Sequence, residues 1–279
     1  MEFDNQFLPL AGEVGLLPVL TWFFMFVTFY AFVGNFIFAL ASRSSVAPIH
    51  RDSRTLTAII AAVAGLSYYF IQDYYRHMLT QVANMDDPVA AGLLQENSFS
   101  AINQLRYIDW TVTTPLLLLK TAQMLRIKFV QAPGAITILL LADILMVITG
   151  YIGEQQVTAD GAVYVAAKLF WGAISTVFYL IIPIILFRFW QRYRQQALPE
   201  EQRAFRLMAL TSVTAWGIYP IGYILSVLPN VDNNWIHISF SIFDVINKVG
   251  IGIIAYRASC QVLDRSVSED SVSKEYGVS

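Results

Sequence analysis

The chain has few of the residues on which soluble enzymes and metalloproteins depend. Charged side chains make up only 14% of its 279 residues, whereas about a quarter of a soluble domain is charged. The single cysteine, Cys260, excludes an intrachain disulfide and a cysteine-based metal site. Three scattered histidines, His50, His77 and His237, form no ligand cluster, so we expect no metal. A net charge of −2 gives no reason to expect a nucleic-acid partner.

Long apolar segments take the place of the missing charges. Hydrophobic residues make up 56% of the chain, and seven stretches reach the length of about 20 residues that a membrane-spanning helix needs. These stretches lie near residues 16–42, 55–75, 103–123, 134–153, 162–187, 207–228 and 236–258. Pro183 and Pro220 fall inside two of them, which membrane helices tolerate. The sequence therefore predicts an all-α bundle of seven transmembrane helices.

Basic residues are concentrated on one side of the predicted membrane. The loops after the first, third and fifth stretches and the C-terminal tail hold most of them, among them Arg43, Arg51 and Arg54. The other side has only Arg76 and Lys168 near its surface. The positive-inside rule then predicts an N-terminus outside the cell and a C-terminus in the cytoplasm.

Two polar segments lie outside the seven stretches. Residues 76–102 form the longest outer loop, for which we expect either a short two-stranded hairpin or no regular structure. Residues 263–279 form a polar cytoplasmic tail that we expect to be disordered. The predicted transmembrane domain is thus residues 1–262.

Lys248 is an ionisable residue inside the seventh stretch, in the run S-F-S-I-F-D-V-I-N-K-V-G-I-G-I-I-A-Y. A lysine in hydrocarbon is costly and therefore indicates a functional site. Asp244 lies one turn earlier on the same helix face, where it can neutralise a cation at Lys248 or on a group bonded to it. A structural ion pair inside a helix bundle is the alternative interpretation.

The third stretch carries further ionisable residues, in R-Y-I-D-W-T-V-T-T-P-L-L-L-L-K. At 100° per residue, Asp109, Thr113 and Lys120 point to one helix face. The helical rise separates Asp109 from Lys120 by about 16 Å, with Asp109 on the outer side. Arg106 lies one turn further out. A line of ionisable groups down one face is the pattern expected of a proton relay.

Simpler structural interpretations stay open for several of these residues. Lys120 could extend its ammonium group to the cytoplasmic interface, and Asp109 and Arg106 could form a static pair. Asp143, in the fourth stretch, could serve only to hydrogen-bond a neighbouring helix. Two carboxylates facing one lysine-borne cation are harder to explain this way, because proton uptake relieves their residual negative charge.

These motifs resemble the microbial rhodopsins, in particular a bacterial proton-pumping group related to proteorhodopsin, and the similarity covers all seven stretches. The run D-V-I-N-K-V-G resembles the retinal-attachment site, which implies that Lys248 carries all-trans retinal as a protonated Schiff base with Asp244 as a counterion. The run R-Y-I-D-W-T-V-T-T-P-L implies that Asp109 is the primary counterion and proton acceptor. The resemblance implies a transport protein of a bacterial plasma membrane, not an enzyme.

The resemblance also implies a retinal pocket and a proton pathway. The run W-G-I-Y-P-I-G-Y resembles the retinal clamp, and parts of the fourth and fifth stretches resemble the wall around the ionone ring. The implied pocket comprises Trp110, Thr114, Leu117, Met146, Gly150, Ser175, Trp216, Tyr219, Pro220, Tyr223 and Asn247. The implied proton pathway comprises Arg106, Thr113, Tyr68 and Glu154. A leucine at the position of Leu117 accompanies green absorption in the family.

Three residues of the third stretch indicate the transported ion. In the family, the positions that match Asp109, Thr113 and Lys120 vary with that ion, and Asp-Thr-Lys resembles a small group of proton pumps with a lysine donor. Inward pumps lack the carboxylate that Asp244 supplies. The resemblance therefore implies outward proton pumping, with Asp109 as acceptor and Lys120 as cytoplasmic donor.

Two positions depart from the relatives. Ser67 stands where many bacterial relatives have a histidine that hydrogen-bonds the acceptor, and a serine cannot hold a proton as that histidine does. Gly172 replaces a bulky tryptophan of some relatives, and it could open a window for a carotenoid antenna or simply allow a close helix contact. Relatives commonly form trimers or pentamers in the lipid bilayer, so we expect a homo-oligomer.

A photosensor with a slow photocycle is the alternative function. The tail is too short to contain a fused signalling domain, so a sensor would signal through a separate partner. A channel is disfavoured, because no extra carboxylates line the second stretch.

Overall fold

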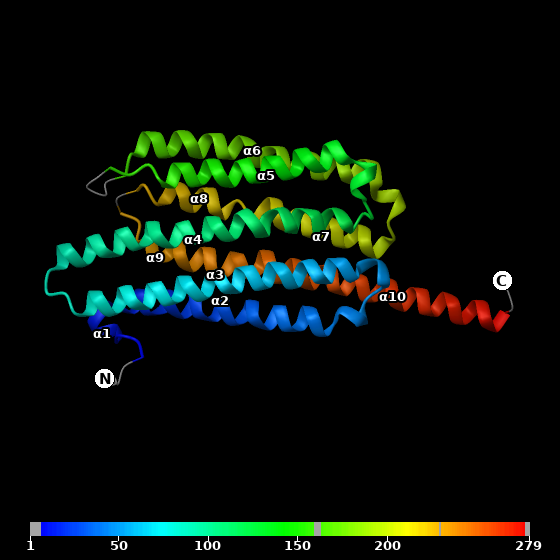
Figure 1. Ribbon diagram of the computed structural model, residues 1–279, viewed down its shortest axis with the longest axis horizontal. Coiled ribbons are helices and arrows are strands. Elements are labelled where there is room, and N and C mark those ends of the chain that lie inside the picture. The colour runs from blue at the N-terminus through cyan, green and yellow to red at the C-terminus, as the bar shows by residue number, and fades with distance from the viewer. Residues whose placement is uncertain (1–6, 159–162, 229, 277–279) are drawn as a thin grey trace.

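Long helices form nearly the whole chain in the computed structural model, which describes residues 7–158, 163–228 and 230–276 (Figure 1). The α-helices are α1 (Ala11–Val14), α2 (Leu16–Ala41), α3 (Arg51–Ala83), α4 (Pro88–Gln123), α5 (Pro133–Glu154), α6 (Val165–Tyr193), α7 (Pro199–Ala215), α8 (Ile218–Leu225), α9 (Asn233–Val245) and α10 (Ile251–Tyr276). Four 3₁₀-helices lie in the connections: η1 (Arg43–Ser45), η2 (Pro48–His50), η3 (Phe129–Gln131) and η4 (Arg194–Gln196). A π-helical turn, η5 (Ile246–Gly250), joins α9 to α10.

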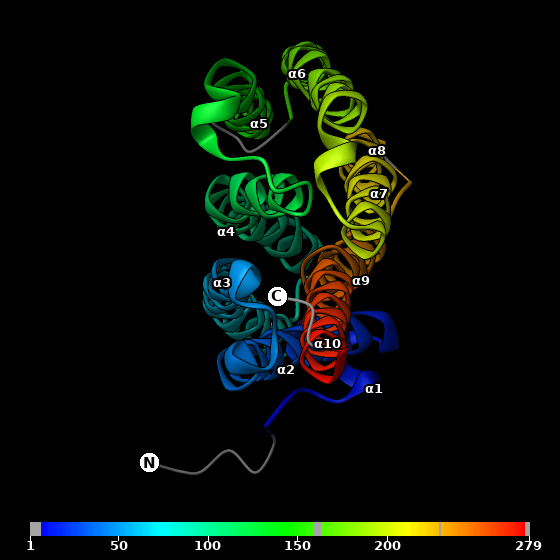
Figure 2. The same ribbon diagram turned by 90° about the vertical axis from the view of Figure 1, so that its right-hand side faces the viewer.

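The described helices form seven rods when α7 is counted with α8, and α9 with η5 and α10. Seen from one end, α3, α4 and α5 stand in one row and α6, α7 and α10 in the other, with α2 beside α3 (Figure 2). Six rods are long and apolar enough to cross a membrane. The exception is α4, because Arg106, Asp109 and Lys120 lower its hydropathy. The predicted all-α, seven-helix architecture is confirmed.

Two ends of the bundle can be named from the orientation that the sequence predicts. The outer end holds the turn between α3 and α4, and the inner end holds the connection between α2 and α3 (Figure 1). Both α4 and α9 run from the outer end towards the inner end (Figure 1). Equivalent steps along these two helices therefore move in the same direction across the membrane.

Residues 76–102 are helical, so the expectation of a hairpin or an irregular loop was wrong. The helix α3 continues to Ala83 and α4 begins at Pro88. The side chain of Asp87 accepts a hydrogen bond from the backbone N–H of Val89 at 2.9 Å. An aspartate N-cap followed by proline is a strong helix start. Hydropathy marks where the membrane ends, and here the helices continue beyond that point.

The helix α10 runs to Tyr276, so the expectation of a disordered tail was wrong up to that residue. Arg265 donates a hydrogen bond to Glu269, four residues later, at 3.0 Å, and lies 3.7 Å from Glu200 of α7. Such pairs support an exposed helix. Residues 277–279 lie outside the described residues, and a domain boundary at residue 262 stays a prediction.

The break between α7 and α8 has a local cause. Proline has no N–H to donate and its ring clashes with the carbonyl group four residues earlier, so Pro220 disturbs the helix at Trp216. The α-helix ends at Ala215 and resumes at Ile218. Both Trp216 and Tyr219, on either side of the restart, line the central cavity described below.

Three apolar clusters form the core of the described residues. One lies mainly between α2 and α3, and the other two divide the core along the membrane normal. The inner apolar cluster is formed by inner halves of helices, and its buried members include Ile60, Leu117, Leu118, Met208, Trp216, Ile251 and Ala255. The outer aromatic cluster comprises Phe99, Trp110, Val147, Ile236 and Phe240. The ionisable residues of α4, and those of the rod formed by α9, η5 and α10, lie beside or between the inner apolar cluster and the outer aromatic cluster.

Candidate functional site

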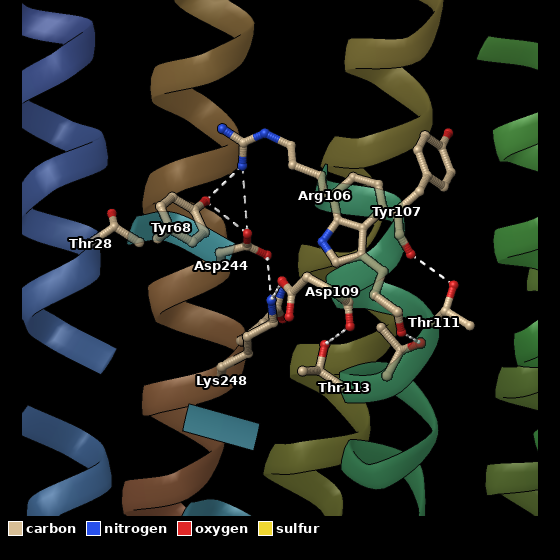
Figure 3. Close-up of polar contacts among 12 residues, drawn as sticks. Thr28, Tyr68, Arg106, Tyr107, Asp109, Thr111, Thr113, Asp244 and Lys248 are labelled. Carbon is tan, nitrogen blue, oxygen red and sulfur yellow. Dashed lines mark hydrogen bonds and ion pairs between the residues drawn. The ribbon is translucent and has the colours of Figure 1, made fainter. Parts of the chain in front are cut away.

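Lys248 and two carboxylates form the centre of the bundle (Figure 3). Lys248 lies on the π-helical turn and is only 2% exposed. Its Nζ donates a hydrogen bond to Oδ2 of Asp109 on α4 and lies 3.5 Å from Oδ1 of Asp244. Turns of this kind occur often at functional sites. The structure thus brings together the three residues that the sequence predicted to face one another.

Arg106 forms its ion pair with Asp244 and not with Asp109. Its Nη1 lies 3.6 Å from Oδ2 of Asp244 and donates to the hydroxyl of Tyr68 at 2.7 Å (Figure 3). Tyr68 and Tyr219 in turn donate hydrogen bonds to Asp244 at 2.8 and 2.7 Å. The alternative of a static Asp109–Arg106 pair is therefore wrong. Two cations and two anions balance one another in this buried cluster, as buried charges require.

Asp109 is the less constrained carboxylate of the two. Its Oδ2 contacts Lys248, whereas its Oδ1 has no hydrogen-bond partner among the described residues. The hydroxyl of Thr113 donates to the backbone carbonyl of Asp109 at 2.9 Å. Asp109 therefore has an oxygen to which a proton can be added without breaking a contact.

A cavity of about 250 Å³ adjoins Lys248, and all the predicted pocket residues line it. The sequence did not indicate several other lining residues, among them Tyr107, Tyr179 and Phe240. Phe240 lies one turn before Asp244 on the same helix, so helical register could have identified it. The other two give no motif that single-sequence reasoning could use.

The walls of the cavity fit a long apolar group attached to Lys248. The rings of Trp110 and Tyr219 lie 4.6 Å apart, and Trp216 and Leu117 supply further apolar surface. Glycine is needed at Gly172, because a Cβ atom there would lie 2.6 Å from Cε1 of Tyr223. An amine flanked by carboxylates at such an apolar cavity suits retinal, and the residues present fit it.

Lys120 is buried in the inner half of the bundle. It is 1% exposed, and its Nζ has no hydrogen-bond partner in the part of the chain that the structure describes. The ammonium group therefore does not reach the interface, contrary to the simpler interpretation. Leu117 and Leu118 of the inner apolar cluster flank it on α4. Burial among such side chains disfavours a cation at Lys120.

Arg54 is a buried residue that sequence reasoning placed in a loop. It lies on α3 and is 2% exposed. Its guanidinium group is between the rings of Phe38 and Tyr256, at 5.0 and 4.7 Å from their centroids, and is close enough to act electrostatically on Lys120. Nothing in the sequence distinguishes it from the basic residues that mark the cytoplasmic side.

Two other predicted or candidate residues are engaged away from Lys248. Asp143 accepts a hydrogen bond from Thr114 on α4 at 2.8 Å, which agrees with the structural interpretation. Glu154 pairs with Lys168 on α6 at 3.1 Å, and Lys168 also donates to Ser226 at 2.9 Å. Both members of that ion pair are buried. Within the described residues, no contact joins Glu154 to Arg106 or Asp244.

Residues 18–262 match the family model described as bacteriorhodopsin-like protein. The chain belongs to this family. The crystal structure of Exiguobacterium sibiricum rhodopsin is 28% identical, with a TM-score of 0.72 over 90% of this chain and 99% of that one. Green-light absorbing proteorhodopsin of Gamma-proteobacterium EBAC31A08 is 22% identical over 235 residues, 82% of each chain. Xanthorhodopsin, described as a light-driven ion pump with dual chromophore, is 22% identical, with a TM-score of 0.72 over 90% of this chain and 96% of that one.

Membership of the family has direct consequences for this rhodopsin. The family implies a retinal chromophore, and its members are light-driven pumps or sensors, not enzymes. The apolar helices and the bacterial relatives make the chain a multi-pass plasma-membrane protein. The roles of individual site residues stay predictions at this point.

Proposed function

We propose that this rhodopsin is a light-driven outward proton pump with all-trans retinal attached to Lys248. The observation that carries the proposal is the direct contact between Lys248 Nζ and the partly unengaged carboxylate of Asp109. The similarity to green-light absorbing proteorhodopsin and to xanthorhodopsin supports it.

Proton release from Lys248 goes to Asp109. Retinal bound to Lys248 would supply light absorption and, by isomerising, the free energy that drives the transfer. Asp244 cannot take the proton without disturbing its contacts with Arg106, Tyr68 and Tyr219. Asp109 has a free oxygen and touches the same Nζ. The contacts support separate roles for the two carboxylates, with Asp109 as acceptor and Asp244 as a fixed counter-charge.

Lys120 returns a proton to Lys248 from the inner side. An unpaired ammonium group in an apolar environment is costly, so the Lys120 side chain rests as a neutral amine. It can then collect a proton from the cytoplasm and hand it outward along α4. The nearby positive charge of Arg54 keeps that protonated state short-lived. Reprotonation from the inside, combined with release to the outside, makes the net transport outward.

Light-induced pH changes in a suspension of retinal-supplied cells test this function. We expect the medium to become more acidic in light, and a protonophore uncoupler to abolish the signal. Alkalinisation that the uncoupler also abolishes would show an inward pump. A coloured protein without any pH signal would favour the slow photosensor with a separate partner. Cells that express the Lys248→Ala variant, which should form no pigment, provide the matched control.

An antenna and an assembly complete the proposal. The ring of Tyr223 lies against Gly172, which supports the close-contact interpretation of this glycine, and a carotenoid at Gly172 stays a prediction. Added carotenoid should give a structured band in the excitation spectrum of the pump only if an antenna binds.

We further propose a trimer or pentamer, which native mass spectrometry in detergent micelles would distinguish from a monomer.

A further inference from the structure

The outer half of the bundle contains a second, larger cavity, of about 630 Å³. Residues of α3, α4 and α9 line it, among them Tyr75, Ser98 and His237. The carboxylate residues Glu96 and Asp232 also line it. The cavity thus lies on the side of Arg106 and Asp244 to which an outward pump must release its proton. The inference drawn from it rests on the proposed function.

His237 lies between that cavity and the charged cluster. It is seven residues before Asp244 on the regular helix α9, hence on the same face and about 10 Å further out. It is only 2% exposed, and its ring packs against Phe99 and Tyr75 at centroid distances of 4.9 and 6.0 Å. Arg106 is close enough for its charge to act on the imidazole.

Polar atoms without protein partners mark the route between these groups. Nδ1 of His237, Oδ1 of Asn103, Oγ of Ser98 and two guanidinium nitrogens of Arg106 are all buried, and none has a hydrogen-bond partner among the described residues. On α4, Asn103 and Ser98 lie about 4.5 and 12 Å outward of Arg106. Buried polar atoms of this kind normally hydrogen-bond internal water, so the series is suited to conducting a proton.

The remaining polar groups near His237 are engaged or lie at the cavity wall. The hydroxyl of Tyr75 donates to Asn234, and the hydroxyl of Ser241 donates to the backbone carbonyl of His237 at 2.9 Å. The side chain of Asp232 caps α9 by accepting from the backbone N–H of Asn234 at 2.8 Å. An imidazole is the side chain best suited to accept and donate a proton under physiological conditions.

We propose that His237 relays the proton that Asp109 releases, past the Arg106–Asp244 cluster, to the outer cavity. Nδ1 accepts a proton from the inner side and Nε2 then gives one up to the cavity, which returns the imidazole to its original charge. Exchange of the remaining ring proton from Nδ1 to Nε2, through water, then restores the starting tautomer. The positive charge of Arg106 opposes a lasting imidazolium and favours release outward. Glu154, tied to Lys168, is not needed for this route.

Time-resolved release in the His237→Ala variant tests the relay. A pH-sensitive dye in the outer medium follows the proton, while flash absorbance follows deprotonation of Lys248 Nζ. We expect release to slow about tenfold or more, with deprotonation unchanged, since a proton-transferring side chain contributes at least this much. Added imidazole, which the cavity can admit, should restore the rate. His77→Ala is the matched control, because His77 is an exposed histidine on α3.

Equal release rates in the His237→Ala, His77→Ala and wild-type proteins would overturn the relay and leave the pump intact. Failure of the wild type to acidify the medium would instead overturn the proposed function. A measurement in the dark on the retinal-free wild-type protein depends neither on pumping nor on the folding of a variant. NMR transfer of magnetisation from water to the imidazole nitrogens should be efficient for His237 and His77. Transfer as weak as that for the buried His50, which is bound to Glu201 at 2.7 Å, would also overturn the relay.

Discussion

The outer and inner halves of this rhodopsin differ in what surrounds their buried polar groups. Outward of Lys248, Arg106 and Asp244 are linked by two tyrosine hydroxyls, and the path beyond them ends at a wide polar-lined cavity. Inward of Lys248, the core is largely hydrocarbon, and Lys120 stands in it without a hydrogen-bond partner among the described residues. One half can pass a proton readily, and the other can admit one only rarely. Such asymmetry favours transport in a single direction.

The largest effect is expected where the two halves meet, at Lys248. Lys248→Ala should abolish the visible absorption band completely, because no other amine adjoins the central cavity among its lining residues. Absorption spectra of purified protein with added retinal provide the measurement. Lys168→Met is the control, since Lys168 is also buried but pairs with Glu154. Colour in the Lys248→Ala protein would show that another residue holds the chromophore.

Removal of the acceptor should inactivate the outer half while the pigment survives. Asp109→Asn leaves an amide that cannot take up the proton, so light-driven acidification should disappear and a visible band should persist. Asp143→Asn is the matched control, because that buried aspartate hydrogen-bonds Thr114 away from Lys248. We expect the control to transport protons. Equal loss of light-driven acidification in the Asp109→Asn and Asp143→Asn variants would contradict a specific role of Asp109 as proton acceptor.

Removal of Lys120 should slow the inner half without stopping it. In Lys120→Met, recovery of the dark state should become about 100-fold slower, because a donor side chain contributes a factor of this order. Recovery should slow further as pH rises, since the proton must then come directly from the cytoplasm. Flash photolysis between pH 6 and pH 9 measures this. Lys128→Met, at an exposed position on the same side, should recover normally.

The smallest effect is expected at Gly172, where α6 packs against Tyr223. Gly172→Ala should destabilise the pigment by about 1–3 kcal/mol, because the new Cβ atom would lie 2.6 Å from the ring of Tyr223. Thermal bleaching of the visible band measures the change. Gly34→Ala is the control, since a Cβ atom there would meet nothing within 4 Å. A stable, normally coloured Gly172→Ala protein would indicate an open window and revive the antenna prediction.

The sequence predicted the helices from the length of its apolar stretches and the central charges from their helical spacing. Residues four apart share a face, which was enough to bring Asp244 beside Lys248. It could not predict that Arg106 pairs with Asp244 across helices, because that choice depends on how α4 and α9 face each other. Arg54 was misplaced for the same reason. A basic residue near a membrane surface looks identical in sequence whether it faces water or lies between aromatic rings.

The helix ends were the least predictable part of the fold. Segment 76–102 lost its apolar character well before its helices ended, and the cap at Asp87 lies outside any hydropathy signal. His237 was set aside in the sequence because it belongs to no motif. His237 lies on the same helix face as Asp244, about two turns further out. That position becomes informative only when the cavity and the unpartnered atoms around it are known.

The π-helical turn at Ile246–Gly250 has a consequence for protein engineering. A π turn accommodates one more residue than an α turn, and each residue of an α-helix corresponds to about 100° of rotation. Deletion of one residue within this turn would therefore let the rod become a continuous α-helix, with α9 and α10 still presenting the same faces on either side of it. Lys248 thus lies in a turn that accommodates an extra residue. Engineered changes in the length of this rod should therefore be made here, where they disturb the flanking helices least.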